Sequence, residues 1–484
     1  MTVSLIIGIL GIYFAALLFI AWLTSKNADS DSFFTGNKQS AWYLVAFGMI
    51  GTSVSGVTFI SVPGMVNATG FSYFQLILGN MAGYFVVAGV LMPIYYKSNM
   101  VSIYTYLEDR YGYWSYKSGS AIFLLSRTLG SSLRLYLAAE VLHTFLFKDL
   151  GVSFAVTVGI TIALIWMYTF KGGVKTIVWT DSFQTLFLVG AVIISVVVIS
   201  QQLGWGVGEM VQKVHESRYS TIFHFEDIGA SNYFWKQFIS GVLITIAMTG
   251  LDQDLMQKNL TCKNLAEAQK NMYWFSVILV AVNLLFLTLG ALLYMYAEEK
   301  GIEIPTQTDF FYPILALKSL GVIAGVFFLL GITASSYASS DSALTALTTA
   351  FCIDFLNFNK HKNENKARVR TYVHIAFSVL FFIIIILFKE FNEGTTVIFM
   401  VLKAAAYTYG PLLGMFAFGI ISKRNVKDGI VPLICLLSPV LTLAVVYGLK
   451  EILGYKTAFE DLLINGLITY TGLYMISSKK TSIA

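Results

Sequence analysis

Long apolar runs dominate this sequence and restrict what the chain can fold into. The first extends from Val3 to Thr24, and about a dozen more follow it along the 484 residues. An apolar run of roughly 20 residues crosses a bilayer as an α-helix, because the helix satisfies every backbone polar group inside the segment. Only 12% of the residues are charged, compared with about 25% in soluble domains. The sequence therefore predicts an all-α integral membrane protein.

About thirteen candidate spans are separated by polar loops. Their approximate bounds are 3–24, 42–68, 71–97, 118–146, 151–170, 172–203, 234–257, 272–298, 319–351, 371–390, 394–421, 429–449 and 460–477. Lysine and arginine are about twice as frequent in the loops of one side as in those of the other, and the richer side is cytoplasmic. We therefore expect a multi-pass protein of the plasma (inner) membrane, with its N-terminus outside and its C-terminus in the cytoplasm.

The ninth span carries many hydroxyl groups for a segment that should cross a membrane. Within it, Ser335, Ser339 and Ser342 are spaced i, i+4 and i+7, so they share one face of a helix. Small neighbours such as Ala338 let another backbone approach closely. Hydroxyl oxygens beside a close backbone suit a small hard cation such as sodium. The alternative is that these hydroxyls only hold helices together, which is common in membranes.

The second span contains a stretch, from Gly51 to Gly64, that weakens a helix. Glycines, several hydroxyl side chains and the pair Pro63-Gly64 occur within it. A helix interrupted at membrane depth lines a cavity or is buried in protein, and its free carbonyls can coordinate an ion. A simple kink without a binding site is the alternative.

Ionisable residues inside the predicted spans need partners, because a bare charge in a bilayer is costly. Arg127 lies near the inner end of the fourth span, and we expect its side chain to extend to the interface. Arg134 lies near mid-span, and Glu140 is a poor local partner because it lies about 120° further around the helix. Arg134 therefore pairs with another carboxylate, a carbonyl cluster or an anionic ligand. Asp181 in the sixth span needs a cation, whereas Asp254 is interpreted as part of an ordinary polar helix end.

Several enzyme signatures are absent from the sequence. It contains no G-x-x-x-x-G-K-[ST] loop and no H-E-x-x-H motif, and its five histidines are scattered. Its three cysteines are far apart and predict neither a disulfide framework nor a metal site. We therefore expect a protein that is not an enzyme.

Five stretches follow one another in a characteristic order. They are the broken helix with Pro63-Gly64, Tyr104-x-Tyr106-Leu107-Glu108-x-Arg110, Gly172-Gly173 followed by Trp179 to Gln184, Asp252-Gln253 with Gln257-Lys258, and the Ser-rich ninth span ending at Asp354. Together they resemble the sodium:solute symporter family, which includes sialic acid, proline, sodium/glucose and monocarboxylate transporters. The resemblance covers nearly the whole chain.

The resemblance implies a fold and a division of the chain. The family has the LeuT-type fold, in which two inverted five-helix repeats hold substrate and sodium near the middle of the membrane. Residues 1–484 would form a single transmembrane transporter domain. Within it, the first helix would be 3–24, repeat one about 42–203, repeat two about 234–421 and the extra helices about 429–477.

The resemblance also implies sodium ligands. The family's main sodium site uses carbonyls of the broken helix and small or hydroxyl residues of the ninth span. The matching positions here are Gly51, Val54, Ser335, Ala338 and Ser339. Some members hold a second sodium near a carboxylate that matches Asp181. Na+ is therefore the expected coupling ion.

The ninth span departs from the family pattern. Ser335 stands where the family usually has Ala, and Ala338 where it usually has Ser. The site either uses the hydroxyls of Ser335 and Ser339 with the backbone of Ala338, or it is shifted by one residue. A shifted site would use Ser336, Ser339 and Ser340.

Substrate contacts in the family come from the broken helix and the third span. The matching positions here are Ser53, Ser55, Thr58, Tyr73 and Gln75. Gly130 stands at the position of the arginine that sialic acid transporters use, so Arg134, one turn on, could take that role only in a shifted pocket. Arg134 nevertheless favours a carboxylate-bearing solute, because a guanidinium matches a carboxylate bidentately.

The resemblance implies a symporter that imports a small polar organic solute with sodium by alternating access. A sialic-acid-like sugar acid or a monocarboxylate is favoured, and a neutral sugar, polyol or amino acid stays open. A transporter-derived membrane sensor is the alternative from another class, and it would need a partner chain for signalling. The expected partners are sodium ions, the solute and the lipid bilayer, without nucleic acid, and we expect the chain to function as a monomer.

Overall fold

The structure of this chain is a computed structural model that is built almost entirely from helices. It describes residues 3–26, 30–98, 100–169, 173–358, 365–391, 396–455, 457 and 459–479. Lys171 and Gly172, which precede the predicted sixth span, lie outside these ranges. Within them, the expected all-α architecture is confirmed.

Eight helical segments of the described chain are long and apolar enough to cross a membrane. They comprise α1 (Val3–Ser25), α5 (Tyr73–Val86) continued by η2 (Val87–Leu91) and α6 (Met92–Lys97), α10 (Gly173–Gln202), α14 (Leu265–Lys300), α16 (Gly321–Ala350) continued by η7 (Phe351–Phe355), α17 (Lys366–Phe391), α18 (Val397–Ile421), and η8 (Asp428–Ile430) with α19 (Val431–Leu453).

Three further pairs of helices pass the same test together but are sharply bent. They are α3 (Trp42–Ser53) with α4 (Gly56–Thr69), bent by 59°; α8 (Tyr113–Leu142), η3 (His143–Phe147) and η4 (Lys148–Leu150) with α9 (Phe154–Thr169), bent by 118°; and α12 (Phe234–Thr245) and η5 (Ile246–Gly250) with α13 (Gln253–Asn259), bent by 70°. Up to 11 spans result if each pair is one span. The expected number of thirteen is not confirmed.

The remaining elements are shorter and lie between the long helices or follow the last of them. They are α2 (Ser30–Thr35), η1 (Gly36–Lys38), α7 (Thr105–Arg110), α11 (Val207–Glu216), η6 (Thr308–Phe310), α15 (Phe311–Lys318), α20 (Asp461–Met475), and the strands β1 (Asn425–Val426) and β2 (Ser477–Ser478), which pair antiparallel.

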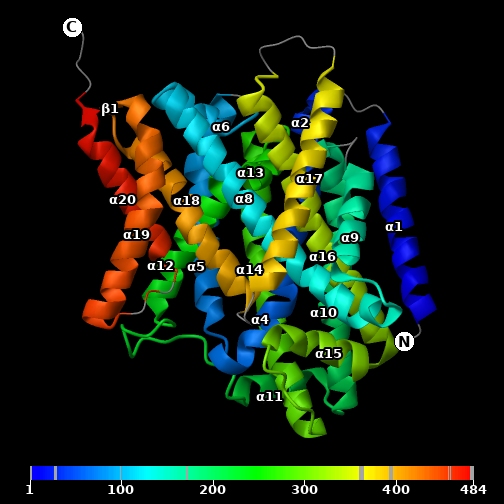
Figure 1. The fold of residues 1–484 in the computed structure, drawn as a ribbon. Helices are drawn as coiled ribbons and strands as arrows, with labels where there is room; N and C mark the ends of the chain where they lie inside the picture. The colour runs from blue at the N-terminus through cyan, green and yellow to red at the C-terminus, as the bar shows by residue number, and fades with distance from the viewer. Residues whose placement is uncertain are drawn as a thin grey trace.

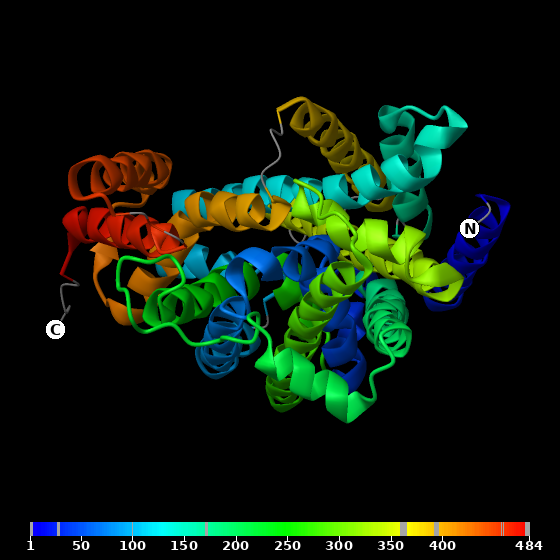
Figure 2. The ribbon, with the colours of Figure 1, turned by 90° about the horizontal axis from the view of Figure 1, so that it is seen from below.

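The long helices form one bundle (Figure 1). The start of α1 and the end of α20 lie at opposite ends of this bundle. Viewed along the bundle, α1 lies at one edge and α19 and α20 lie at the opposite edge (Figure 2). The helices between them therefore form the interior.

The centre of the bundle is α16, and every residue from 328 to 350 of this helix is buried. Its Gly, Ala and Ser residues present little bulk, so α16 packs closely along α10 and reaches α8 and α4. Close packing of small residues replaces the hydrophobic effect as the source of helix association in a membrane. The polar stretch of the ninth span therefore lies inside protein, away from lipid.

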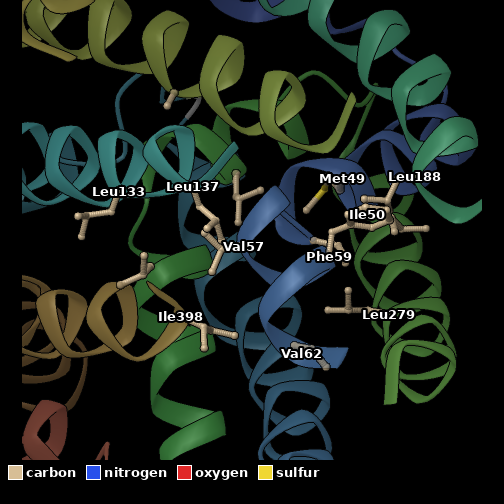
Figure 3. Close-up of a cluster of buried hydrophobic side chains, with 14 of the residues drawn as sticks. Met49, Ile50, Val57, Phe59, Val62, Leu133, Leu137, Leu188, Leu279 and Ile398 are labelled. Carbon is tan, nitrogen blue, oxygen red and sulfur yellow. The ribbon is translucent and has the colours of Figure 1, made fainter. Parts of the chain in front are cut away.

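Apolar side chains surround the broken helix α3/α4. Figure 3 shows Leu133, Leu137 and Ile398 on one side of this helix, and Leu188 and Leu279 on the other. These side chains come from α8, α18, α10 and α14, so four helices hold the break in place. An irregular backbone is tolerated here because it is enclosed by protein.

Candidate functional site

The α-helical hydrogen-bond ladder stops between α3 and α4. The N–H of Val54 donates to the carbonyl of Ile50 at 2.7 Å, and the next helix starts with the N–H of Phe59 bonded to the carbonyl of Ser55 at 3.0 Å. Val54 and Ser55 have non-helical ψ angles of 77° and 171°. The carbonyls of residues 51–54 therefore lie at the interruption, beyond the end of the regular ladder.

A partly open cavity of about 120 Å³ lies beside this interruption. Its walls come from α3, α4, α5, α8, α12, η5, α13 and α18. Five of the six predicted substrate residues line it, which are Ser53, Ser55, Thr58, Tyr73 and Arg134. The sequence thus identified residues from three separate helices that meet at one cavity.

Gln75 is the exception and requires a correction. Its side chain is fully buried but is not part of the cavity wall. The amide nitrogen donates to the carbonyl of Asn232 at 2.8 Å, and the amide oxygen accepts the N–H of His224 at 3.1 Å. Gln75 therefore fixes the outer loop to α5 with both ends of its amide.

Arg134 projects into the cavity from α8. It makes no hydrogen bond or ion pair with any residue that the structure describes. Glu140, the poor local partner, pairs instead with Lys389 of α17 at 3.3 Å. Gly130 is not part of the cavity wall. The arginines that line this cavity are Arg127 and Arg134.

Arg127 does not extend to the interface, which corrects the expectation from its position. The side chain is buried and forms an ion pair with Asp254 of α13. Its Nη1 also lies 3.7 Å from Oδ2 of Asp252. Asp254, interpreted as part of an exposed helix end, is 2% exposed and also accepts a hydrogen bond from Ser342. The prediction failed because α12 and α13 break inside the bundle, so α13 is the second half of a broken helix.

The residues of α13 hold this break in place, and all seven of them are buried. Asp252 caps the helix by accepting the N–H groups of Asp254 and Leu255, and it accepts a hydrogen bond from Tyr409 of α18. Further along α13, polar side chains bond to other elements: Gln253 to Val101 and Ile103, Gln257 to Phe34 and Thr349, and Asn259 to Asn271. The short helix is thereby joined to several long ones.

Sequence reasoning missed the polar residues that the second broken helix and α5 contribute to the cavity. They are Asn80, Tyr84, Thr245 and Thr249. The signal for the break was Gly250 just before the N-cap Asp252. This pattern is weaker than a Pro-Gly pair, and the apolar run hides it.

Two hydroxyl residues of α16 lie against the start of α4. A Cβ added to Gly56 would overlap the hydroxyl of Ser336 and would lie 3.5 Å from the hydroxyl of Ser335. The absence of a side chain at Gly56 therefore lets α4 approach α16 this closely. Because Gly56 directly follows the interruption, Ser335 and Ser336 lie near it, and a sodium site shared by the broken helix and α16 stays a prediction.

The hydroxyls of α16 differ in their partners. Ser335 donates to the carbonyl of Ile332 and Ser339 to that of Ser336, both at 3.1 Å within the helix. The hydroxyls of Ser336 and Ser340 are buried and have no hydrogen-bond partner in the described chain. These two residues lie one turn apart on one face. Unsatisfied buried oxygens suit a cation, whereas Ala338 contributes no side-chain oxygen.

Gly51 lies against α10. Its N–H donates to Oγ1 of Thr185 at 3.0 Å, and Thr185 donates to the carbonyl of Asp181 at 2.8 Å. Asp181 itself is fully buried, and its Oδ2 lies 2.5 Å from Nζ of Lys258. Thr52 donates to the same oxygen at 2.9 Å. The cation required beside Asp181 is therefore supplied by the chain itself in this structure, and a sodium ligand role for Asp181 stays a prediction.

These features define a class of protein. An all-helical bundle that encloses a polar cavity between two broken helices is the architecture of a secondary transporter, not of an enzyme. A profile described as "SSF: Sodium:solute symporter family" matches residues 33–432. The chain belongs to the sodium:solute symporter family. Sodium is the coupling ion of this family.

The curated relatives that match this chain include several symporters. The sodium/sialic acid symporter SiaT of Proteus mirabilis is 22% identical over 90% of this chain and 88% of the relative. The sodium/sialic acid symporter NanT of Aliivibrio fischeri is 23% identical over 89% and 84%, respectively. The human sodium-coupled monocarboxylate transporter 2 is 23% identical over 85% of this chain and 68% of the relative.

Solved structures show the same fold. A sodium-coupled sialic acid symporter in a substrate-bound outward-open state superimposes with a TM-score of 0.84, at 19% identity, over 98% of this chain and 99% of the other. Mhp1, a nucleobase-cation-symport-1 family transporter, gives a TM-score of 0.57 at 14% identity over 93% and 96%. The expected LeuT-type fold is confirmed.

Proposed function

We propose that this sodium-coupled symporter imports a small solute that bears a carboxylate. The observation that carries the proposal is the guanidinium of Arg134, which lines the cavity without an ion-pair partner in the described chain. A permanent positive charge inside a membrane-spanning bundle needs an anion. A carboxylate matches its two parallel N–H donors.

The rest of the cavity fits the uncharged part of such a solute. Ser53, Ser55, Thr58 and Thr249 offer hydroxyl groups, whereas Val401 and Leu402 offer apolar surface. Two of the relatives are named as a sodium/sialic acid symporter and a sodium-coupled monocarboxylate transporter, and both names refer to solutes that carry a carboxylate. Both observations support an organic acid over a neutral solute.

Sodium binding at the α4–α16 contact would couple the gradient to this cavity. We propose the shifted set of hydroxyl ligands, Ser336, Ser339 and Ser340, with the carbonyls of Gly51 and Val54. The free hydroxyls of Ser336 and Ser340 support this choice over Ser335 and Ala338. Because the ligands lie on two helices, the ion favours the conformation in which those helices are close.

The topology follows from the family's architecture. We propose two inverted repeats at about 42–203 and 234–421, flanked by the helix at 3–24 and extra helices at about 429–477. The N-terminus lies outside and the C-terminus lies in the cytoplasm of a plasma (inner) membrane protein that functions as a monomer. The two broken helices, α3/α4 and α12/α13, occupy corresponding places in the two repeats, which supports this division.

Uptake into proteoliposomes tests the proposal. An inward sodium gradient should drive uptake of an organic acid, and excess organic acids, unlike neutral sugars, should compete. The variant Arg134→Gln should weaken solute affinity by about tenfold to a hundredfold, as expected for a lost charge-assisted hydrogen bond. Arg134→Lys, which keeps the charge but not the planar fork, is the matched control and should be intermediate.

A different result would overturn the substrate class. If only neutral sugars, polyols or amino acids compete, and Arg134→Gln keeps their affinity, Arg134 is structural and the solute is neutral. If no solute enters with sodium under any condition, the chain acts as a sensor and not as a symporter.

A further inference from the structure

A groove between α9 and α17 opens toward the lipid. Both helices lie at the surface of the bundle (Figure 2), and only 22% of the most apolar stretch of α17 is buried. On α9, the lining residues follow the helical spacing i, i+3, i+4 and i+7, and they are Gly159, Ile162, Ala163 and Trp166. Because Gly159 and Ala163 present little bulk, the two helices leave a groove of about 390 Å³ between them.

The groove has two closed ends and an apolar wall. At one end, Nε2 of His374 in α17 lies 3.2 Å from Oγ1 of Thr169 in α9. At the other end, a Cβ added to Gly159 would lie 3.9 Å from the ring of Phe382 in α17. The hydroxyl of Ser378 donates to the carbonyl of His374 at 2.9 Å, so its proton is already bound. The lining therefore suits a hydrocarbon chain better than a polar ligand.

The start of α17 carries basic residues, which are three of its first five. Lys366 donates to the carbonyl of Phe358 at 2.6 Å, and the guanidinium of Arg370 lies over the ring of Phe33. Arg368 is exposed and has no hydrogen bond or ion pair with any residue that the structure describes. Of the three cations, Arg368 is therefore the one whose side chain is available to a ligand.

Arg368 lies on the face of α17 that forms the groove. At 100° per residue, Ile375, Val379 and Phe382 fall within about 40° of it around the helix. Tyr372, which is 63% exposed, lies on the same face. At 1.5 Å per residue, Ile375 is about 10 Å and Phe382 about 21 Å from Arg368 along the helix axis. Half of a bilayer with its headgroup region is about 20–22 Å thick, so a lipid whose phosphate contacts Arg368 has its acyl chain beside the groove.

We propose that the groove binds an acyl chain of an anionic phospholipid of the cytoplasmic leaflet, with the lipid phosphate on Arg368. A guanidinium forms charge-assisted hydrogen bonds to phosphate oxygens, and tyrosines such as Tyr372 favour the headgroup level. The cytoplasmic leaflet carries the anionic lipids that attract basic residues at helix ends. The choice of leaflet uses the proposed orientation of the chain, whereas the proposed solute plays no part in this site.

Such a lipid would act on the helix that carries the proposed sodium ligands. His374, which bounds the groove, also places its Nδ1 3.0 Å from Oγ1 of Thr348 in α16. Tyr168 of α9 donates to Asp341 of α16 at 2.7 Å. A lipid in the groove therefore supports the two helices that hold α16, and its binding should stabilise the folded protein.

Native mass spectrometry of the full-length protein tests the site. Delipidated protein in a neutral detergent is titrated with phosphatidylglycerol, which is anionic, or with phosphatidylcholine, which has no net charge. Phosphatidylglycerol should bind about fivefold to tenfold more tightly, as expected for an anionic headgroup on one arginine. Arg368→Gln should remove most of this difference.

Two further variants separate the headgroup from the acyl chain. Ala163→Phe fills the groove without changing any charge, and it should weaken the binding of both lipids several-fold. Lys423→Gln is the matched control, because it removes one exposed positive charge from the loop after α18. This control should leave both affinities unchanged.

Equal affinities of the wild type for the two lipids would overturn the proposal, and so would an Arg368→Gln variant that behaves like Lys423→Gln. A free fatty acid that binds as tightly as phosphatidylglycerol would show that no phosphate is recognised. If a variant does not fold, the shift of the wild-type thermal midpoint on addition of phosphatidylglycerol is compared at low and high salt. A shift that salt does not reduce would also contradict the role of Arg368. Absence of sodium-driven uptake would contradict the proposed function alone, because lipid binding is measured without transport.

Discussion

The ammonium of Lys258 lies 2.5 Å from the carboxylate of Asp181, although 77 positions separate the two residues in sequence. Lys258 lies in the last turn of α13, the second half of one broken helix, and Thr52, which contacts both groups, lies in the last turn of α3, the first half of the other. The pair therefore joins both broken helices to α10. Movement of α3 or α13 relative to α10 requires this contact to change.

The buried pair should be costly to break from one side. Lys258→Met leaves the carboxylate of Asp181 buried without its cation, and the free energy of unfolding should fall by about 3–5 kcal/mol. The double variant Lys258→Met/Asp181→Leu should recover most of this loss, because no charge stays buried. Denaturant or thermal unfolding in detergent measures both. Additive losses in the double variant would show that the two groups do not interact.

Three single variants distinguish the shifted from the unshifted set of sodium ligands on α16. Ser336→Ala and Ser339→Ala should each raise the sodium concentration for half-maximal uptake several-fold while folding stays intact, because each removes one ligand oxygen. Ser335→Ala should leave sodium dependence unchanged, because Ser335 is not among the ligands of the shifted set. The reverse pattern, with Ser335 sensitive and Ser336 insensitive, would establish the unshifted register.

Acid should stabilise the folded state through the buried carboxyl of Asp309 in η6. Asp309 of η6 accepts the N–H of Val397 at 3.0 Å, and burial raises the pKa of this carboxyl above its usual value. The folded protein therefore binds this proton more tightly than the unfolded chain. The resulting stabilisation is complete below the ordinary carboxyl pKa of about 3.9 and is lost as pH rises through the raised pKa.

The variant Asp309→Asn isolates this effect. It keeps an acceptor for the N–H of Val397 but cannot titrate, so its thermal midpoint should depend less on pH across the acidic range. The comparison is made at constant ionic strength from pH 4 to pH 8. Superimposable pH profiles for the two proteins would exclude Asp309 as the titrating group.

Removing one partner of the ion pair between Arg127 and Asp254 should destabilise the fold about as much as removing Lys258 from its pair with Asp181. Asp254→Asn removes the charge that compensates a buried guanidinium, and a loss of about 3–5 kcal/mol of stability is expected. Arg127 would keep only the more distant carboxylate of Asp252, at 3.7 Å, so the positive charge at the cavity would rise and an anionic solute should bind more tightly. Stability and solute affinity measured in parallel check both effects. Unchanged stability would mean that Arg127 finds another partner.

Much of this architecture was readable from the sequence because its signals are local. Apolar length predicts spans, and the glycines around residues 51–64 predict an interruption, which the structure places at Val54 and Ser55. Arg134 and Asp181 were recognised as interior charges because each lies deep within an apolar run. These inferences need only the cost of polar groups in a bilayer.

The partners of those charges were not readable. Arg127 and Asp254 are 127 positions apart, and only the folded bundle brings them together. The short helix α13 was interpreted as a cytoplasmic end because the break before it has no proline, and its burial depends on neighbours that are distant in sequence. The partners of Gln75 were not readable either, because its amide bonds to Asn232 and His224, which are distant from it in sequence.

The many hydrogen bonds of α13 have a consequence for how strictly ion movement is coupled to solute movement. Its side chains bond to α2, α3, α8, α10, α14, α16 and α18, so a partial displacement breaks several bonds before any new ones form. We expect intermediate positions of α13 to be higher in free energy than either end state, which would suppress uncoupled leak of ions through partly open forms.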